Sequence, residues 1–150
     1  MRITLDTNIV LQDLVRRASH GRLVLRDGRC EFLIAEPIRD ETDEQIDAFF
    51  DRRVTQGRLD RQEQASEAAA IKALIDFHVR VERPSGYMGF AQSAKHRTID
   101  PDDWPTVAVA LATNSYIWTA DKNHFWGCGI ATWSTAVLAI YLGVEDPNGI

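Results

Sequence analysis

Two aspartates stand directly after short apolar runs that are typical of buried strands. Asp6 follows the run RITL, and Asp121 follows the run YIWTA. In an open α/β sheet, the ligand site lies beyond the carboxyl ends of the strands, where the strand order reverses. We therefore expect both carboxylates to enter a crevice at one edge of the sheet, and not a solvated surface.

Two further acids are expected near the same edge. Asp103 begins a helix just before the strand that ends at Asp121, and Glu41 lies in the first turns of the helix after the run CEFLIA. Carboxylates at contact distance repel one another unless a cation neutralises them, and hard divalent cations prefer oxygen ligands. The four acids therefore predict a site for Mg²⁺ or Mn²⁺.

The elements that must position these acids are strands separated by helices. Apolar runs predict strands over residues 1–6, 30–35, 115–120 and 130–135. Helical spacing predicts helices over residues 8–17, 37–57, 59–77, 106–113 and 136–143, with Pro37 and Pro105 in first turns and Gly57 at a helix end. Residues 83–98 are expected to form a loop. This order predicts an α/β fold, a three-layer α/β/α sandwich with a mainly parallel central sheet.

Length and composition favour one domain over residues 1–150. An apolar content of 45% is enough for a hydrophobic core. Cys30 and Cys128 form no CxxC or Cys/His pattern, so neither a zinc site nor a disulfide framework is indicated. No apolar run has the length of a membrane span, and the N-terminus meets an acid too early for a signal peptide. We expect a cytoplasmic protein without a membrane partner.

The charge distribution limits how the chain can meet nucleic acid. A net charge of −5 argues against binding through a general positive field, because such binding needs many Lys and Arg contacts to phosphates. The basic residues gather in three stretches, within residues 16–29, 52–61 and 95–97. Local basic ridges around an acidic centre are compatible with this pattern.

The ordered acidic motifs resemble those of the PIN domain (PilT N-terminal) nucleases, which include ribonuclease toxins of toxin–antitoxin pairs. The resemblance covers LDTNIVLQDL and DPDDWPTVAVALATNSYIWTADKNHF through GIATWST, nearly half of the chain. The family has Asp-Thr-Asn after the first strand, a Glu early in a later helix, an Asp that opens a small-apolar helix, and Thr-x-Asp after a further strand. The matching residues here are Asp6-Thr7-Asn8, Glu41, Asp103 and Thr119-Ala120-Asp121.

The resemblance implies catalytic and metal-binding roles for the four acids. Asp6 and Asp121 are implied as primary ligands of Mg²⁺ or Mn²⁺. Asp103 and Glu41 would hold a second ion or orient water molecules. Hydrogen bonds from two neighbouring side chains would fix the carboxylates in place. These two neighbours are Asn8 and Thr119.

The resemblance also implies a substrate and partners. The substrate would be single-stranded or loop RNA, cut by phosphodiester hydrolysis to give 5′-phosphate and 3′-hydroxyl ends. If the chain is a toxin, an antitoxin protein would insert a basic side chain into the acidic crevice, and a homodimer is implied. The acidic DPDDWP run differs from the shorter form that is common in the toxins.

Several assignments within these motifs stay open. Glu41 has four rivals within a turn or two of helix, namely Glu36, Asp40, Asp43 and Glu44. Asp103 directly precedes the small-apolar helix, and Asp100 and Asp102 are expected to cap or support it.

Histidine and tryptophan side chains near the acids are auxiliary candidates. His124 follows Asp121 by three residues and is a possible general acid of a metal-free ribonuclease, although nothing in the sequence places a second histidine beside it. Trp118 and Trp133 are expected in the core, whereas Trp104 and Trp126 flank the acidic centre and are candidates for substrate contact.

Two other classes of function compete with the ribonuclease hypothesis. A haloacid dehalogenase-type phosphatase also begins from an Asp after the first strand, but it needs a second Asp two residues later, where this chain has Asn8. A catalytically silent module that binds RNA or protein would not need the carboxylates, so their presence argues against it.

Overall fold

The computed structural model describes residues 1–16 and 19–144, and in them a parallel sheet of five strands forms the centre. The strand order is β3-β2-β1-β4-β5, and every neighbouring pair is parallel. The strands are β1 (Arg2–Leu5), β2 (Glu31–Ala35), β3 (Val79–Glu82), β4 (Tyr116–Trp118) and β5 (Thr132–Trp133). The mainly parallel sheet expected from the sequence is thus confirmed.

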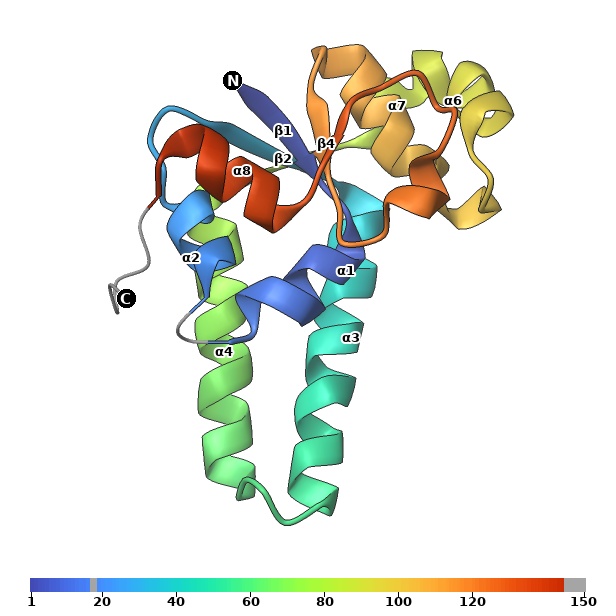
Figure 1. Cartoon of the computed structure of the whole chain (residues 1–150). Helices are drawn as coiled ribbons and strands as arrows, with labels where there is room; N and C mark the ends of the chain where they lie inside the picture. The colour runs from blue at the N-terminus through green and yellow to red at the C-terminus, as the bar shows by residue number, and fades with distance from the viewer. Residues whose placement is uncertain (17–18, 145–150) are drawn as a thin grey trace.

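Helices cover both faces of this sheet. The α-helices are α1 (Thr7–Ile9), α2 (His20–Leu25), α3 (Glu36–Thr55), α4 (Arg61–His78), α5 (Pro84–Tyr87), α6 (Ala91–Arg97), α7 (Trp104–Thr113) and α8 (Thr135–Leu142). Shorter turns are η1 (Val10–Leu14), η2 (Met88–Phe90), η3 (Pro101–Asp103) and η4 (Lys122–Phe125). Helix α7 packs on β1 and β2, with α6 beside it, while α2 and α8 pair on the other side of the strands (Figure 1). The three-layer α/β/α arrangement is confirmed.

The central strands β1 and β4 lead to the edge of the sheet where Asp6 and Asp121 are expected. Ile3, Leu5, Ile117 and Trp118 are completely buried. Burying each side chain of this size contributes about 1.5–3 kcal/mol to folding relative to leaving it exposed. Strands held this firmly fix the positions of the residues that follow them, which is the property that a preorganised site requires.

The helix boundaries follow local sequence signals. Pro37 lies in the first turn of α3, and Gly57 takes a left-handed φ of 70° just after that helix ends. Asp60 caps α4, because its Oδ1 atom accepts a hydrogen bond from the backbone N–H of Glu63 at 2.8 Å. Within the described ranges, none of the helices has the length and apolarity needed to cross a membrane.

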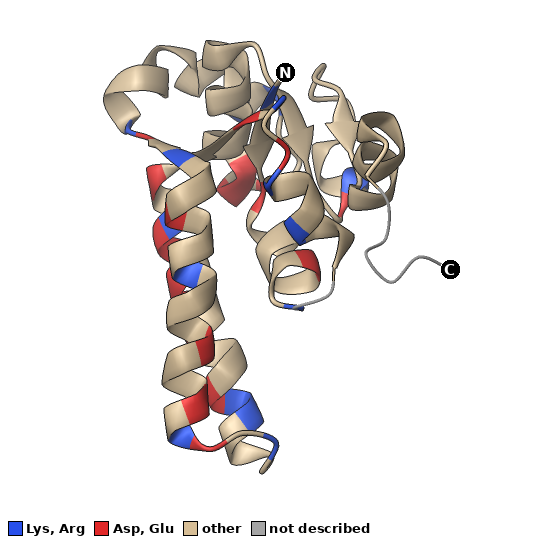
Figure 2. Ribbon diagram, turned by 90° about the vertical axis from the view of Figure 1, so that its left-hand side faces the viewer, with Lys and Arg blue, Asp and Glu red and all other residues tan. Residues whose placement is uncertain are grey.

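Helices α3 and α4 form an antiparallel hairpin that extends beyond the sheet, with charges of both signs along it (Figure 2). Arg39 is buried between the two helices and pairs with Asp43 and Asp76. Lys72 pairs with Asp47 at 2.8 Å. These cations are already engaged by acids of the hairpin.

The loop predicted over residues 83–98 is wrong, and helix α2 was not predicted. The expected loop contains α5, η2 and α6, and β3 lies just before it. These elements are too short for a helical or strand period to be visible, and packing stabilises them instead: Tyr87 and Ala94 are buried beneath α7. Strand β3 is an edge strand, and Val81 on it is exposed, which explains its weak apolar signal.

Candidate metal centre

The strand order reverses between β1 and β4. From β1 the chain proceeds to β2 and β3 on one side, and β4 and β5 lie on the other. Asp6 directly follows β1, and its backbone N–H donates to the carbonyl of Trp118 in β4 at 3.1 Å. The segments that carry Asp6 and Asp121 therefore leave the sheet side by side, as the sequence predicted.

A hydrogen-bonded network joins these two segments. The Thr119 hydroxyl donates to Oδ2 of Asp6 at 2.8 Å and accepts from the backbone N–H of Asp121 at 3.0 Å. The Oδ1 atom of Asn8 accepts from the backbone N–H of Ala120 at 3.1 Å. Asn8 and Thr119 thus lie where they fix the Asp6 carboxylate and the turn that leads to Asp121.

Asp121 itself caps the short helical turn η4. Its Oδ1 atom accepts from the backbone N–H of Asn123 at 3.1 Å, which leaves Oδ2 facing the imidazole of His124. The Nε2 atom of His124 lies 3.2 Å from this Oδ2, and its Nδ1 atom lies 3.5 Å from Oδ2 of Asp103. The half-exposed imidazole therefore bridges two of the four acids.

Asp103 enters the centre from the turn before α7. Its Oδ2 atom is buried and, among the described residues, has no hydrogen-bond partner. Asp100 caps the same turn by accepting from the backbone N–H of Asp102 at 3.0 Å, while Asp102 is exposed. Asp100 thus supports the turn, in line with the sequence analysis. A buried carboxylate oxygen without a donor is an arrangement that a cation would satisfy.

The pKa values of three acids are raised by this environment. Burial is the main cause for Asp103, whose pKa rises to about 7, and the charges of Asp6 and Asp100 add to it. Burial also raises the pKa of Asp6, although the hydrogen bond from Thr119 opposes the shift. The pKa of Glu41 is raised by burial first and then by the charge of Asp6.

Glu41 approaches the centre from the second turn of α3. Its carboxylate accepts a hydrogen bond from Nε2 of Gln45 at 2.7 Å. Two of its rivals form ion pairs with arginines. Asp43 pairs with Arg39, and Glu36 lies 3.8 Å from Arg83. The electrostatic coupling of Glu41 to Asp6 and Asp103 favours it as the fourth acid.

The residues at this edge fit a hard divalent cation. Their ligand atoms are carboxylate oxygens, burial and then mutual repulsion raise three pKa values, and one buried carboxylate oxygen has no hydrogen-bond donor among the described residues. Bringing such acids together without a compensating cation is unfavourable, so the arrangement is suited to binding one.

Aromatic and basic side chains border the centre. Trp104, directly after Asp103, packs beside Tyr87, and Nζ of Lys95 lies 4.7 Å from the centre of its ring. Trp126 is 74% exposed, which is unusual for so large an apolar side chain. Trp118 is buried in the core as expected. The contact of Lys95 with Trp104 escaped the sequence analysis, because only the packing of α6 on α7 brings them together.

Comparison with known structures supports the fold. Over 97% of its length, the chain resembles PAE2754 from Pyrobaculum aerophilum, covering 91% of that chain with 14% identity and a TM-score of 0.66. It resembles VapBC-1 from nontypeable Haemophilus influenzae with 18% identity and a TM-score of 0.55, covering 91% of this chain and 99% of that one. For FitAB bound to an IR36 DNA fragment, the identity is 16%, the TM-score 0.55, and the coverage 89% and 94%.

Sequence comparison gives the family. No curated protein matches the chain. The sequence model described as PIN domain matches residues 4–143, which include all four acids of the centre. The chain therefore belongs to the PIN domain family.

Proposed function

We propose that the chain is an endoribonuclease that requires Mg²⁺ or Mn²⁺ and cuts single-stranded or loop RNA. The observation that carries the proposal is that the charges of Asp6, Glu41, Asp103 and Asp121 are coupled near the point where the strand order reverses, and that the pKa of three of these acids is raised, mainly by burial. PIN domains are typically nucleases that depend on divalent metals, and this family membership supports a hydrolase activity for the chain.

In this proposal, the carboxylates of Asp6, Asp103 and Asp121 would hold the metal. When bound, a divalent ion supplies the positive charge that activates a water molecule and offsets charge on the phosphate. Thr119 keeps the Asp6 carboxylate oriented through its 2.8 Å hydrogen bond.

Glu41 is proposed to orient the attacking water and accept its proton. A raised pKa brings a carboxylate closer to neutrality and makes it a better base. Attack on phosphorus forms the new P–O bond and breaks the bond to the 3′-oxygen, which takes a proton from solvent water and leaves as a hydroxyl, and the phosphate stays on the 5′ end.

RNA cleavage is expected to depend fully on the divalent ion. Purified protein should cut an unstructured, end-labelled RNA in Mg²⁺ or Mn²⁺, stop in excess EDTA, and resume when either ion is added back. The measurement is product length and end chemistry on a gel. Activity undiminished by EDTA would contradict the proposal and would favour a histidine mechanism instead.

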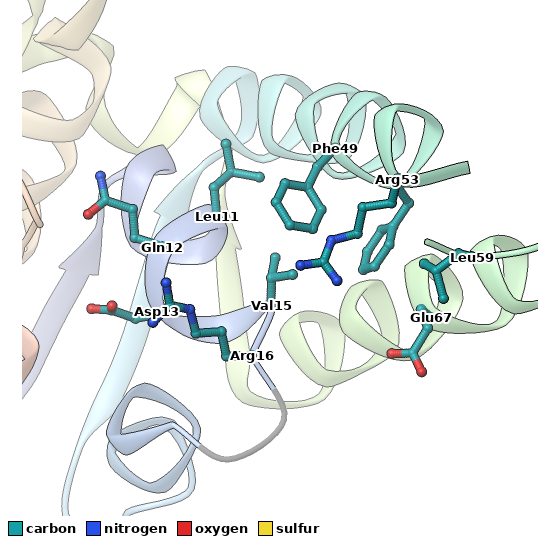
Figure 3. Close-up of a pocket in the computed structure, with 10 residues that line it drawn as sticks. Leu11, Gln12, Asp13, Val15, Arg16, Phe49, Arg53, Leu59 and Glu67 are labelled. Carbon is teal, nitrogen blue, oxygen red and sulfur yellow. The ribbon is translucent and has the colours of Figure 1, made fainter. Parts of the chain in front are cut away.

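We further propose a protein partner, as in the VapBC-1 and FitAB structures that the fold resembles. A pocket of about 750 Å³ lies between η1 and the α3–α4 hairpin (Figure 3). Leu11, Val15, Phe49 and Leu59 give it an apolar lining, and Arg53, stacked on Phe49 at 5.1 Å, adds a cation. The polar rim carries charges of both signs, from Asp13, Arg16 and Glu67 as well as Arg53, so an amphipathic segment with apolar anchors would match this lining.

A substitution in the pocket should separate partner binding from cleavage. Leu59→Asp is expected to reduce recovery of a small partner protein that co-purifies with the tagged chain at least tenfold, because it places a charge in the apolar lining. RNA cleavage by the purified variant should be unchanged. Phe77→Asp is the control, since Phe77 is 84% exposed and does not line the pocket. If no partner co-purifies and expression leaves growth unaffected, the chain acts without an antitoxin.

We also propose that the chain forms a homodimer through helix α8. Helix α8 contains no charged residue, and it exposes the apolar side chains of Val137, Ile140 and Tyr141. Helices with apolar residues on all sides are normally covered, which favours this face as the contact between two copies.

A further inference from the structure

Three side chains at the border of the acidic centre could bind a metal ion together, and one of them offers a nitrogen ligand. Asp100, Asp103 and His124 can each offer one ligand atom, and these atoms lie within 4.8 Å of one another. Two ligands on opposite sides of one hard ion are separated by about 4 Å or slightly more, which is twice the metal–oxygen distance. Small side-chain movements would therefore bring all three donors onto one ion.

The orientation of the His124 ring points to the same arrangement. Its Nδ1 atom faces Oδ2 of Asp103 at 3.5 Å, and that oxygen is the buried one without a hydrogen-bond partner. Its Nε2 atom faces Oδ2 of Asp121 at 3.2 Å. A histidine that binds a metal through one nitrogen usually donates its other N–H to a carboxylate, which fixes the ring. Asp121 is placed to be this carboxylate.

Asp100 completes the set without losing its structural role. Its Oδ1 atom accepts a hydrogen bond from the backbone N–H of Asp102. The second oxygen of the Asp100 carboxylate can therefore act as a metal ligand. The capped turn η3 also holds Asp100 and Asp103 close together, because Asp100 is its cap and Asp103 its last residue.

We propose that Asp100, Asp103 and His124 form a mixed nitrogen–oxygen metal position beside the one proposed for Asp6 and Asp121, with Asp103 shared between the two. This inference rests on the proposed function only in that a divalent ion binds the centre. Imidazole suits Zn²⁺, Cu²⁺, Ni²⁺ and Fe²⁺ best, and both Mn²⁺ and Mg²⁺ favour oxygen ligands, but Mn²⁺, as a transition ion, accepts an imidazole nitrogen more readily than Mg²⁺ does. The position therefore selects Mn²⁺ over Mg²⁺.

The test is pulsed electron paramagnetic resonance of the full chain titrated with Mn²⁺ alone, followed by calorimetric titration with Mn²⁺ and with Mg²⁺. We expect a nitrogen-14 coupling on bound Mn²⁺ that disappears in His124→Ala and persists in His96→Ala, a control that removes an exposed histidine of α6. His124→Ala should weaken Mn²⁺ binding at the mixed position about tenfold or more and Mg²⁺ binding far less. Asp100→Asn should weaken Mn²⁺ binding while keeping the nitrogen coupling.

The possible outcomes separate this inference from the proposed function. Bound Mn²⁺ without a nitrogen coupling, or a coupling that survives in His124→Ala, would overturn the mixed position and leave a metal-dependent nuclease intact. If neither Mn²⁺ nor Mg²⁺ binds the wild-type chain at all, both proposals fail together. Because His124 is 47% exposed on its side chain, its removal should not prevent folding, and equal melting temperatures of the metal-free proteins would verify this.

Discussion

The Asp103→Asn variant is expected to melt at a higher temperature than the wild-type protein at about pH 8 without metal, and to lose RNA cleavage. Burial and the charges of Asp6 and Asp100 raise the pKa of Asp103 to about 7. The ionised carboxylate therefore destabilises the metal-free fold. Asparagine has a similar volume and removes the repelling charge, but it also removes a metal ligand.

The sign of the effect follows from proton binding. A carboxyl group with a raised pKa in the folded state binds protons better there than in the unfolded chain, so its favourable contribution is present at low pH. That contribution is lost as pH rises from the unfolded value near 3.8 through the folded value of about 7. Above pH 7 the gain from Asp103→Asn should be roughly 1–2 kcal/mol, since water and salt screen part of the repulsion.

Thermal melts at about pH 8 and about pH 4, with and without Mn²⁺, measure this effect. The advantage of Asp103→Asn should vanish near pH 4, and Mn²⁺ should stabilise the wild type more than the variant. Asp102→Asn is the matched control, because Asp102 is the exposed neighbour in the same turn. A variant that is less stable than the wild type at pH 8 would show that Asp103 serves mainly to build the turn.

Replacing Thr119 by Val should destabilise the fold by about 2–3 kcal/mol at neutral pH and reduce cleavage at least a hundredfold. Thr119 is completely buried, and its hydroxyl donates to the buried carboxylate of Asp6. A hydrogen bond to a charged group contributes about 1.5–3 kcal/mol, and its loss leaves a buried carboxylate less satisfied. Valine preserves the volume, so the effect comes from the hydroxyl.

The pH dependence distinguishes this cause from lost packing. The hydrogen bond from Thr119 lowers the pKa of Asp6 against the larger effect of burial, so its removal should raise that pKa further. The extra destabilisation should thus be largest at neutral pH and shrink as Asp6 becomes protonated at low pH. Urea unfolding at several pH values measures it, with Thr119→Ser as the variant that retains the hydroxyl. Equal losses at every pH, or equal losses for Ser and Val, would contradict this role.

Asp6 and Asp121, which follow β1 and β4 within three residues, were predictable from the sequence because their setting is local. Asp6 and Asp121 end apolar runs, and parallel strands carry such residues to the same edge. Asp103 was marked by the small-apolar run that became α7. The order of strands and helices likewise indicated the parallel sheet, because alternation of these elements requires crossovers that cover both faces.

Other features depend on packing that no local pattern encodes. Short elements such as α5 and α6 are stabilised where Tyr87 and Ala94 meet α7, so their sequences have no clear period of their own. The choice of Glu41 within an acidic helix depends on the direction in which α3 leaves the sheet. The bridge that His124 makes between Asp103 and Asp121 needs the turn η4, which was not predicted.

Anomalous diffraction from crystals grown with Mn²⁺ shows whether these carboxylates hold a divalent ion. We expect an anomalous peak bounded by carboxylate oxygens of Asp6, Asp103 and Asp121, at metal–oxygen distances of about 2.0–2.3 Å. Crystals that contain Mn²⁺ only at other sites, with the Asp103 carboxylate free of metal, would contradict it.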